Sequence, residues 1–241
     1  MSLLKRNNAA GKPSADVGVD VTVAHVSQAA SISETGTLTT AAPEANDFIV
    51  VYTSTSGGIL RTGTSLTLDG VSGVRIGSEQ AIDGGGQAVT LNSWGFVRSA
   101  MPNAGGTYNY VYTASGGIND IAVILCQYRD VDQATPTELT LGSLGTNVST
   151  PATLSTPRAA GISRFVSTAG SIAHNESSPS TGDVAIEAGY TTRAHDIANN
   201  RSSMAVADIQ TADAANSVWT YSRDPVLDSI ATQSFVINAA T

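Results

Sequence analysis

The chain has 241 residues, of which 41% are hydrophobic but only 5% aromatic, and its net charge is −8. This length suffices for one large all-β domain whose core needs no disulfide or metal, and a single cysteine excludes a disulfide framework within one chain. The acidic balance argues against nucleic-acid binding, which needs a basic surface, and no apolar run approaches the ~20 residues that span a membrane.

The N-terminal residues 1–18 lack hydrophobic periodicity, and we expect an extended arm there. Lys5, Arg6 and Lys12 give the first twelve residues a charge of +3 without any acid. The remaining chain holds the other nine basic residues and all 20 acidic ones, a net charge of −11. These three cations are candidate contacts to an acidic partner surface, and an ordinary flexible terminus explains them equally well. No apolar stretch follows them, so no signal peptide is expected.

After the arm, short runs of β-branched and aromatic residues alternate with Gly, Pro and Asn turns, which is typical of an all-β protein. Strands are predicted at 19–28, 35–40, 47–54, twice within 66–81, and at 87–98, 108–113, 121–126, 138–148, 162–168, 184–192, 202–210, 216–222 and 230–238. We also expect a bulge near Asn92 or Gly95, a long exposed loop over 170–182, and at most one helical turn over 194–199.

About twelve short strands with these turns predict an all-β, antiparallel two-sheet jelly-roll-like β-sandwich with an extended N-terminal arm. Neither a shift in composition nor a repeat of fixed period divides the body. We therefore expect one β-sandwich domain over 19–241.

Several segments carry a resemblance to a known family through their order along the chain. They are Asn46-Asp47 before Phe48–Tyr52, then Ser93–Arg98, Gly106–Tyr108, Tyr110–Thr113, Ala122–Leu125 and Tyr128–Asp132. This order resembles jelly-roll-like β-sandwich domains of bacteriophage virion proteins and some bacterial surface proteins. The resemblance covers roughly residues 20–136, and it departs from the family at Asn46 and Asp130, where Gly is usual.

The resemblance implies a sandwich fold and a virion setting, and it carries over no catalytic residue because the shared positions are core and turn positions. We therefore expect a non-enzymatic virion structural protein, such as a capsid decoration or head/tail-associated subunit. Its expected partners are capsid or tail subunits, contacted through the arm. A closed homo-oligomer such as a trimer would cover its edge strands. No cofactor is expected.

Tyr108, Tyr110 and Tyr112 alternate along one predicted strand and therefore share a face. Aromatic rings with polar tips suit both protein interfaces and sugar stacking, so this row is a candidate recognition surface, together with Trp219. A carbohydrate- or receptor-binding module, with a surface glycan as partner, is therefore the alternative function. A core-facing strand is the favoured interpretation of the tyrosine row itself.

Residues that could carry catalysis or bind metal form no recognisable pattern. None of the three histidines has the spacing of a metal pair, and no Gly-x-Ser-x-Gly motif marks a serine nucleophile. Cys126 lies within an apolar run and is predicted to be a buried, inert thiol. Asp130 and Asp132 could share a Ca²⁺ ion, but a solvated turn is the favoured interpretation. A hydrolase would need a clustered pair of carboxylates that the sequence does not reveal.

Overall fold

The computed structural model describes twelve stretches of the chain. They are 24–61, 64–82, 87–101, 105–115, 120–144, 148–149, 152–158, 164–173, 183–198, 202–211, 215–221 and 227–240. The predicted arm at 1–18, with Lys5, Arg6 and Lys12, lies outside these residues, as does His174. Among the described residues, no helix is long and apolar enough to cross a membrane.

The described residues form 18 strands and one short 3₁₀ helix. In chain order these are β1 (Ala24–Ser31), β2 (Thr35–Thr39), β3 (Phe48–Gly57), β4 (Ser65–Leu68), β5 (Val71–Ser72), β6 (Val74–Ile82), β7 (Ala88–Val97), η1 (Arg98–Ala100), β8 (Thr107–Thr113), β9 (Asp120–Arg129), β10 (Thr137–Leu144), β11 (Val148–Ser149), β12 (Ala152–Arg158), β13 (Arg164–Ala173), β14 (Val184–Ile186), β15 (Thr191–Ala198), β16 (Ser202–Thr211), β17 (Ala215–Tyr221) and β18 (Leu227–Ile237).

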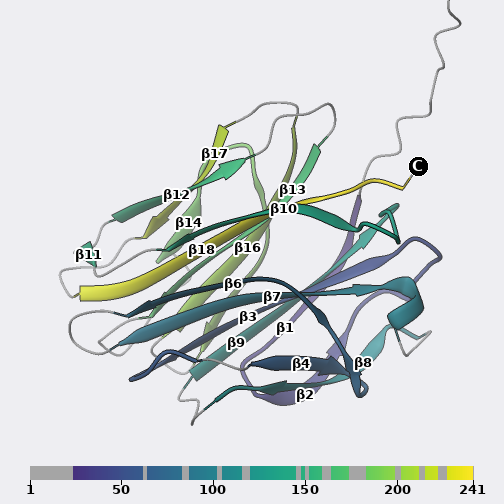
Figure 1. Cartoon of the computed structure of the whole chain (residues 1–241), viewed down its shortest axis with the longest axis horizontal. Helices are drawn as coiled ribbons and strands as arrows, with labels where there is room; N and C mark the ends of the chain where they lie inside the picture. Colours follow the sequence, from purple (N-terminus) through teal and green to yellow (C-terminus); the bar gives the residue numbers. More distant parts are fainter. Residues whose placement is uncertain are drawn as a thin grey trace, which may run out of the picture.

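These strands form four antiparallel sheets stacked as four layers (Figure 1). Inner sheet 1 has the order β1-β9-β3-β7-β6, and inner sheet 2 has the order β10-β18-β13-β16-β15. Outer sheet 1, β2-β8-β4-β5, covers the first, and outer sheet 2, β12-β17-β14, covers the second. The predicted all-β fold of packed antiparallel sheets is confirmed, although the described residues form four sheets rather than two. Its jelly-roll description stays a prediction.

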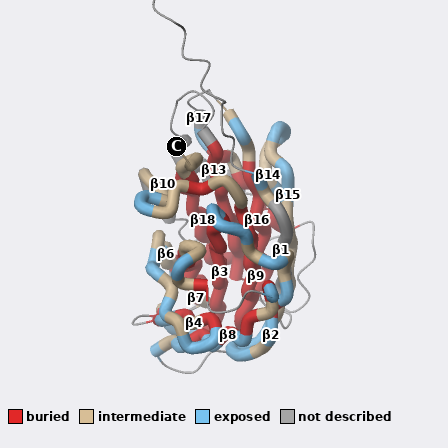
Figure 2. The backbone as a smooth tube through the Cα atoms, turned by 90° about the vertical axis from the view of Figure 1, so that its right-hand side faces the viewer, coloured by how far each residue is buried: buried red, intermediate tan, exposed pale blue. Residues whose placement is uncertain are grey.

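Three hydrophobic cores fill the spaces between the four layers. The central core lies between the two inner sheets and includes Phe48, Tyr128 and Phe235. Trp94 belongs to the core under outer sheet 1, and Trp219 belongs to the core under outer sheet 2. The middle strands of the inner sheets are therefore buried on both faces (Figure 2). Large apolar side chains therefore occur at both odd and even positions of these strands, in place of the alternation of a strand with one face in water.

The prediction of a bulge near Asn92 or Gly95 is wrong, because the bulge lies in a neighbouring strand. Strand β7 pairs with β3 without any shift in register, and the bulge lies in the neighbouring β6, between Arg75 and Gly77. The apparent slip in the apolar spacing between Leu91 and Trp94 has another cause. These two side chains belong to cores on opposite faces of the sheet, so both parities of the strand are apolar.

Two further local predictions concern the second half of the chain, and the first of them is corrected. The loop predicted over 170–182 begins later, because residues 170–173 continue β13 and pair with both β16 and β18. The rest of that loop, 174–182, lies outside the described residues. No helical turn forms over 194–198, where β15 runs and pairs with β16, and this agrees with the expectation of at most one turn over 194–199.

The two halves of the chain repeat one topology. Residues 24–129 form inner and outer sheet 1, and residues 137–237 form inner and outer sheet 2. The corresponding strands are β1/β10, β2/β12, β3/β13, β4/β14, β6/β15, β7/β16, β8/β17 and β9/β18. The described residues thus form two pairs of sheets that share a central core, and the single domain over 19–241 stays a prediction.

The pairing registers make the two halves comparable residue by residue. Phe48 of β3 pairs with the next-to-last residue of β9, and Phe165 of β13 pairs with the last residue of β18. The edge strands carry the same irregularity, because Ile76 in β6 and Arg193 in β15 are each skipped by the register of the neighbouring strand. Strand β6 meets β10 across the central core, and β15 meets β1 in the same way (Figure 2). Such reciprocal contacts are expected when the two halves of the chain are related by an approximate twofold axis.

Candidate functional site: an apolar groove between two edge strands

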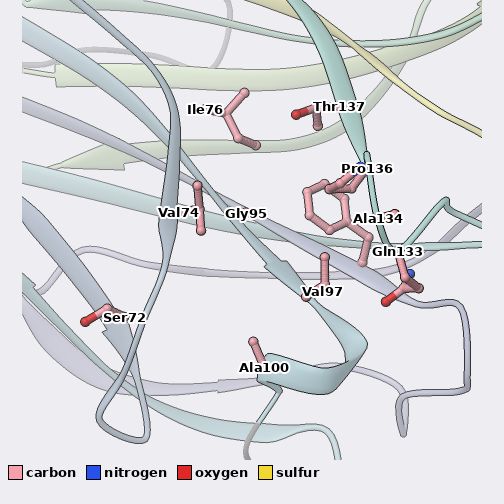
Figure 3. A pocket seen from close by; sticks show the side chains of 11 residues that line it. Ser72, Val74, Ile76, Gly95, Val97, Ala100, Gln133, Ala134, Pro136 and Thr137 are labelled. Atoms are coloured by element: carbon pink, nitrogen blue, oxygen red, sulfur yellow. The ribbon is translucent and has the colours of Figure 1, made fainter.

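An apolar groove with a volume of about 330 Å³ opens where the edge strand β6 lies next to the start of β10 (Figure 3). It is lined from β5, β6, β7, η1 and the segment 133–137, with Phe48 of β3 contributing from the central core. Val74, Ile76, Val97 and Pro136 supply most of its apolar wall. A volume near 300 Å³ lies at the lower end of the range for binding sites, so the groove suits a few aliphatic side chains rather than a large ligand.

Gly95 and Phe48 determine the depth of the groove. A Cβ atom added to Gly95 would lie 2.7 Å from Cζ of Phe48 and 3.3 Å from Cδ1 of Ile76. The Phe48 ring therefore rests directly against the glycine backbone, where any side chain would displace it. Ile76 borders the same space from the bulge in β6, and bulges commonly redirect a side chain in this way.

The rim of the groove is an exposed apolar edge. Val74 at the start of β6 is 74% exposed, the largest value among the large hydrophobic residues of the described chain. In the described residues β6 pairs with β7 along one side, and it forms the end of its sheet on the other. An open edge strand with an exposed aliphatic side chain is a surface to which another chain can pair.

The charged side chain of Arg75 and the polar side chain of Gln133, both near the groove, are held by other partners. Arg75 donates to the backbone carbonyl of Thr64 and, at 2.7 Å, to its hydroxyl, while its guanidinium lies 4.7 Å from the centre of the Trp94 ring. The Gln133 side chain accepts from the backbone N–H of Arg98 at 2.7 Å and donates to the carbonyl of Val131 at 2.9 Å. Among the described residues that line the groove none is charged, so the site favours an apolar segment.

The equivalent position in the second half of the chain is closed by an ion pair. By register, Arg193 corresponds to Ile76 and Asp208 to Gly95. The Arg193 guanidinium donates two hydrogen bonds of 2.7 Å to the Asp208 carboxylate, which is 2% exposed. The two halves therefore share a backbone here but differ in chemistry: one edge is filled by a charge pair and the other is open and apolar.

His25 of β1 lies beside this ion pair. Its ring meets the Tyr128 ring edge-on at 5.7 Å, and its Nε2 atom has no hydrogen-bond partner among the described residues. Burial, with a smaller contribution from the Arg193 charge, lowers the pKa of His25 to about 4. His25 is therefore neutral near pH 7.

The three tyrosines of β8 face the core, as the favoured interpretation predicted. The alternative, that they form an exposed recognition surface, is wrong. Tyr108, Tyr110 and Tyr112 are at most 2% exposed, and they pack between outer and inner sheet 1. Strand β8 lies inside its sheet, and inner sheet 1 covers the face that the tyrosines occupy. Trp219 is fully buried in the equivalent core of the second half, so it is also unavailable for sugar stacking.

The remaining candidates have structural roles in the described residues. Cys126 is fully buried as predicted, and burial raises its pKa to about 12, which leaves the thiol unreactive. Asp132 accepts hydrogen bonds from the backbone N–H groups of Ala134 at 2.8 Å and Thr135 at 3.1 Å, so it stabilises a turn. The described residues contain no group of three or more His, Cys, Asp or Glu side chains placed to hold a metal ion.

The sequence did not reveal one pair of potentially catalytic side chains. Nε2 of His195 lies 2.7 Å from Oγ of Ser203, a distance at which histidine can activate a serine. Ser203 is fully buried, however, so the described structure offers no route for a substrate to this hydroxyl. We interpret the pair as a structural hydrogen bond between the neighbouring strands β15 and β16.

No protein-family model, no curated protein and no solved structure matches this chain. The resemblance to phage virion domains therefore remains a hypothesis that rests on the sequence segments alone.

Proposed function

We propose that this chain is a non-enzymatic structural subunit of a bacteriophage virion, of the capsid decoration or head/tail-associated kind, that attaches to its partners through its N-terminal arm. The observation that carries the proposal is the open groove beside β6, which is apolar, uncharged and continuous with an exposed sheet edge. A surface of this kind fits the docking of another polypeptide, because strand pairing supplies affinity and a pocket supplies selectivity.

Two features of the chain support an assembly role. The basic arm, with Lys5, Arg6 and Lys12, precedes a body (19–241) with a net charge of −10, so arm and body attract each other between copies. The described body is a stack of four layers with three closely packed cores, which suits a structural role. A closed homo-oligomer, such as a trimer, would cover the edge of β6, where the sheet ends among the described residues.

Co-sedimentation with particles tests the proposal. The full chain, tagged at its C-terminus, is expected to remain with purified particles through a density gradient. Deletion of residues 1–18 should release it while the circular dichroism spectrum and the unfolding midpoint of the body stay unchanged. If the full chain never sediments with particles, or if the deleted chain remains attached to the same extent, attachment through the arm is refuted.

A carbohydrate- or receptor-binding module is the second candidate, and the outer face of outer sheet 1 favours it. Thr37 donates a 3.0 Å hydrogen bond to the Asn109 side chain, which donates a 2.9 Å hydrogen bond to Asp69. These exposed groups form a polar row on the outer sheet that can hydrogen-bond to sugar hydroxyls. Binding on a glycan array that Asn109→Ala abolishes would support this candidate, and an array without any hit would remove it.

A further inference from the structure

We propose that the groove beside β6 is the docking site for Leu3 and Leu4 of the N-terminal arm of a neighbouring copy of this chain. The inference rests on the proposed assembly function, since it names the surface that receives the arm. It begins from a contrast within the molecule. The same backbone position is filled by Arg193 and Asp208 in one half, whereas Ile76 and Gly95 leave it open in the other.

The arm has the chemistry that the groove requires. Leu3 and Leu4 are the only adjacent pair of large apolar residues in residues 1–18, and Lys5 and Arg6 follow them directly. Aliphatic side chains match the uncharged wall that includes Val74, which is otherwise 74% exposed to water. The two cations that follow suit the net negative charge of the body.

The backbone of β6 supports the same occupant. Because β6 ends its sheet in the described structure, an extended segment can add to this edge as a further strand. Side chains of an added strand alternate between its two faces, so one leucine would enter the groove while the next would lie along Val74. The arm needs no preformed structure for this, since pairing with β6 fixes its conformation on binding.

The position of the groove favours an arm from a neighbour over the arm of the same molecule. Strand β1, to which the arm is joined, lies at the opposite edge of inner sheet 1 from β6. Both faces of that sheet are covered by other sheets, so the arm cannot cross them and would have to run around the stack. The 20 residues from Leu4 to Ala24 extend to about 70 Å, which is ample to reach the edge of an adjacent copy directly.

A binding assay with the arm as a free peptide tests the inference. The receptor is the full chain carrying Leu3→Ser and Leu4→Ser, so that its own arm does not compete. The probe is a peptide of residues 1–18 labelled at its C-terminus and followed by fluorescence anisotropy. We expect saturable binding to this receptor and at least tenfold weaker binding when the peptide itself carries Leu3→Ser and Leu4→Ser, which keeps its charges.

Matched receptor variants locate the site. Val74→Asn should weaken binding of the unchanged peptide at least tenfold, while Val111→Asn, which alters another exposed valine on outer sheet 1, should leave it unchanged. Equal affinities for these two variants, or no binding at all, would overturn the inference. Light scattering of the unmodified chain should show an oligomer that Val74→Asn converts to a monomer. If the unmodified chain is a monomer whose groove is nevertheless blocked to the peptide, the arm docks within its own molecule and the neighbour is refuted.

The two proposals can fail separately. If the chain sediments with particles but does not bind the peptide, the virion role stands and the docking of the arm in the groove is refuted. A chain that binds the peptide through Val74 but never sediments with particles keeps the docking site and loses the virion role.

Discussion

At the scale of single residues, small side chains decide where the cores close and where the groove opens. Gly95 lets the Phe48 ring lie against the β7 backbone. Gly170 lets Trp219 approach β13 in the same manner, since a Cβ atom added there would lie only 2.6 Å from Cδ2 of the ring. Neither role is readable from the sequence, because a glycine in a strand predicts a bulge or a close approach without telling which. The bulge proved to lie in β6 instead.

Replacing Gly95 by alanine should destabilise the fold. The added methyl group would displace the Phe48 ring or the backbone, and overpacking of this kind costs about 1–3 kcal/mol. The free energy of unfolding in urea measures this. Ser65→Thr, which adds a methyl group at an exposed position of β4, serves as the control and should change stability by less than about 0.5 kcal/mol. Equal stability of both variants would contradict the packing of Phe48 on Gly95.

Because the pKa of His25 is lowered in the folded chain, we expect the free energy of unfolding to fall in mild acid. Its pKa is about 4 in the folded chain because burial and Arg193 disfavour the charged ring, against 6.5 when the chain is unfolded. Between these values the unfolded state binds more protons, so the stabilisation is complete above pH 6.5 and is lost as the pH falls towards 4. The ring is only half-buried and partly screened by solvent, so we expect a loss of about 1 kcal/mol.

Urea unfolding at about pH 7.5, 5.5 and 4.5 would show this slope, and His25→Gln should reduce it. His195, whose pKa is also lowered by burial, adds to the slope in the same direction, so the variant should not abolish it. A His25→Gln chain with the same pH dependence as the unmodified chain would mean that His25 does not titrate in this environment.

At the scale of elements, the strands that are buried on both faces were the easiest to predict. The segments predicted at 47–54 and 87–98 correspond to β3 and β7, because stretches of β-branched and aromatic residues bounded by turn residues leave few alternatives. Strand β12 was missed since Pro157 lies within it. It forms the edge of outer sheet 2, where a proline removes no required hydrogen bond. Over 194–199 the sequence allowed at most one helical turn, and in the described part, to Ala198, pairing with β16 makes it a strand.

The Arg193–Asp208 ion pair at the edge strand β15 should contribute more to stability than Arg75 at the edge strand β6. Arg193→Ala leaves the Asp208 carboxylate buried without its cation, and breaking a buried pair in this way costs about 3 kcal/mol or more. Arg75→Ala in β6 is the matched control, because Arg75 is exposed and should contribute about 1 kcal/mol or less through its contacts to Trp94 and Thr64. Equal losses in the two variants, measured by urea unfolding, would contradict the assigned difference between the edges.

At the scale of the whole molecule, the repeated topology is the feature that the sequence concealed. Equivalent positions rarely share a residue: Phe48 corresponds to Phe165, but Val50 corresponds to Ser167 and Tyr52 to Ala169. Sheets are specified by burial pattern and pairing rather than by identity, so two halves can share a fold without a visible repeat. The candidate site was missed for the same reason, since the residues that line the groove come from segments between Phe48 and Thr137 that only the fold brings together.

The measurement that tests the account most directly is a high-resolution electron-microscopy reconstruction of particles from the source of this chain. The account predicts regular density for the four-layer body on the shell or tail, with an extended segment from a neighbouring copy lying along β6 and side chains entering the groove at Val74. Particles without such density would contradict the virion role, and bodies in place with an empty groove would contradict the docking of the arm.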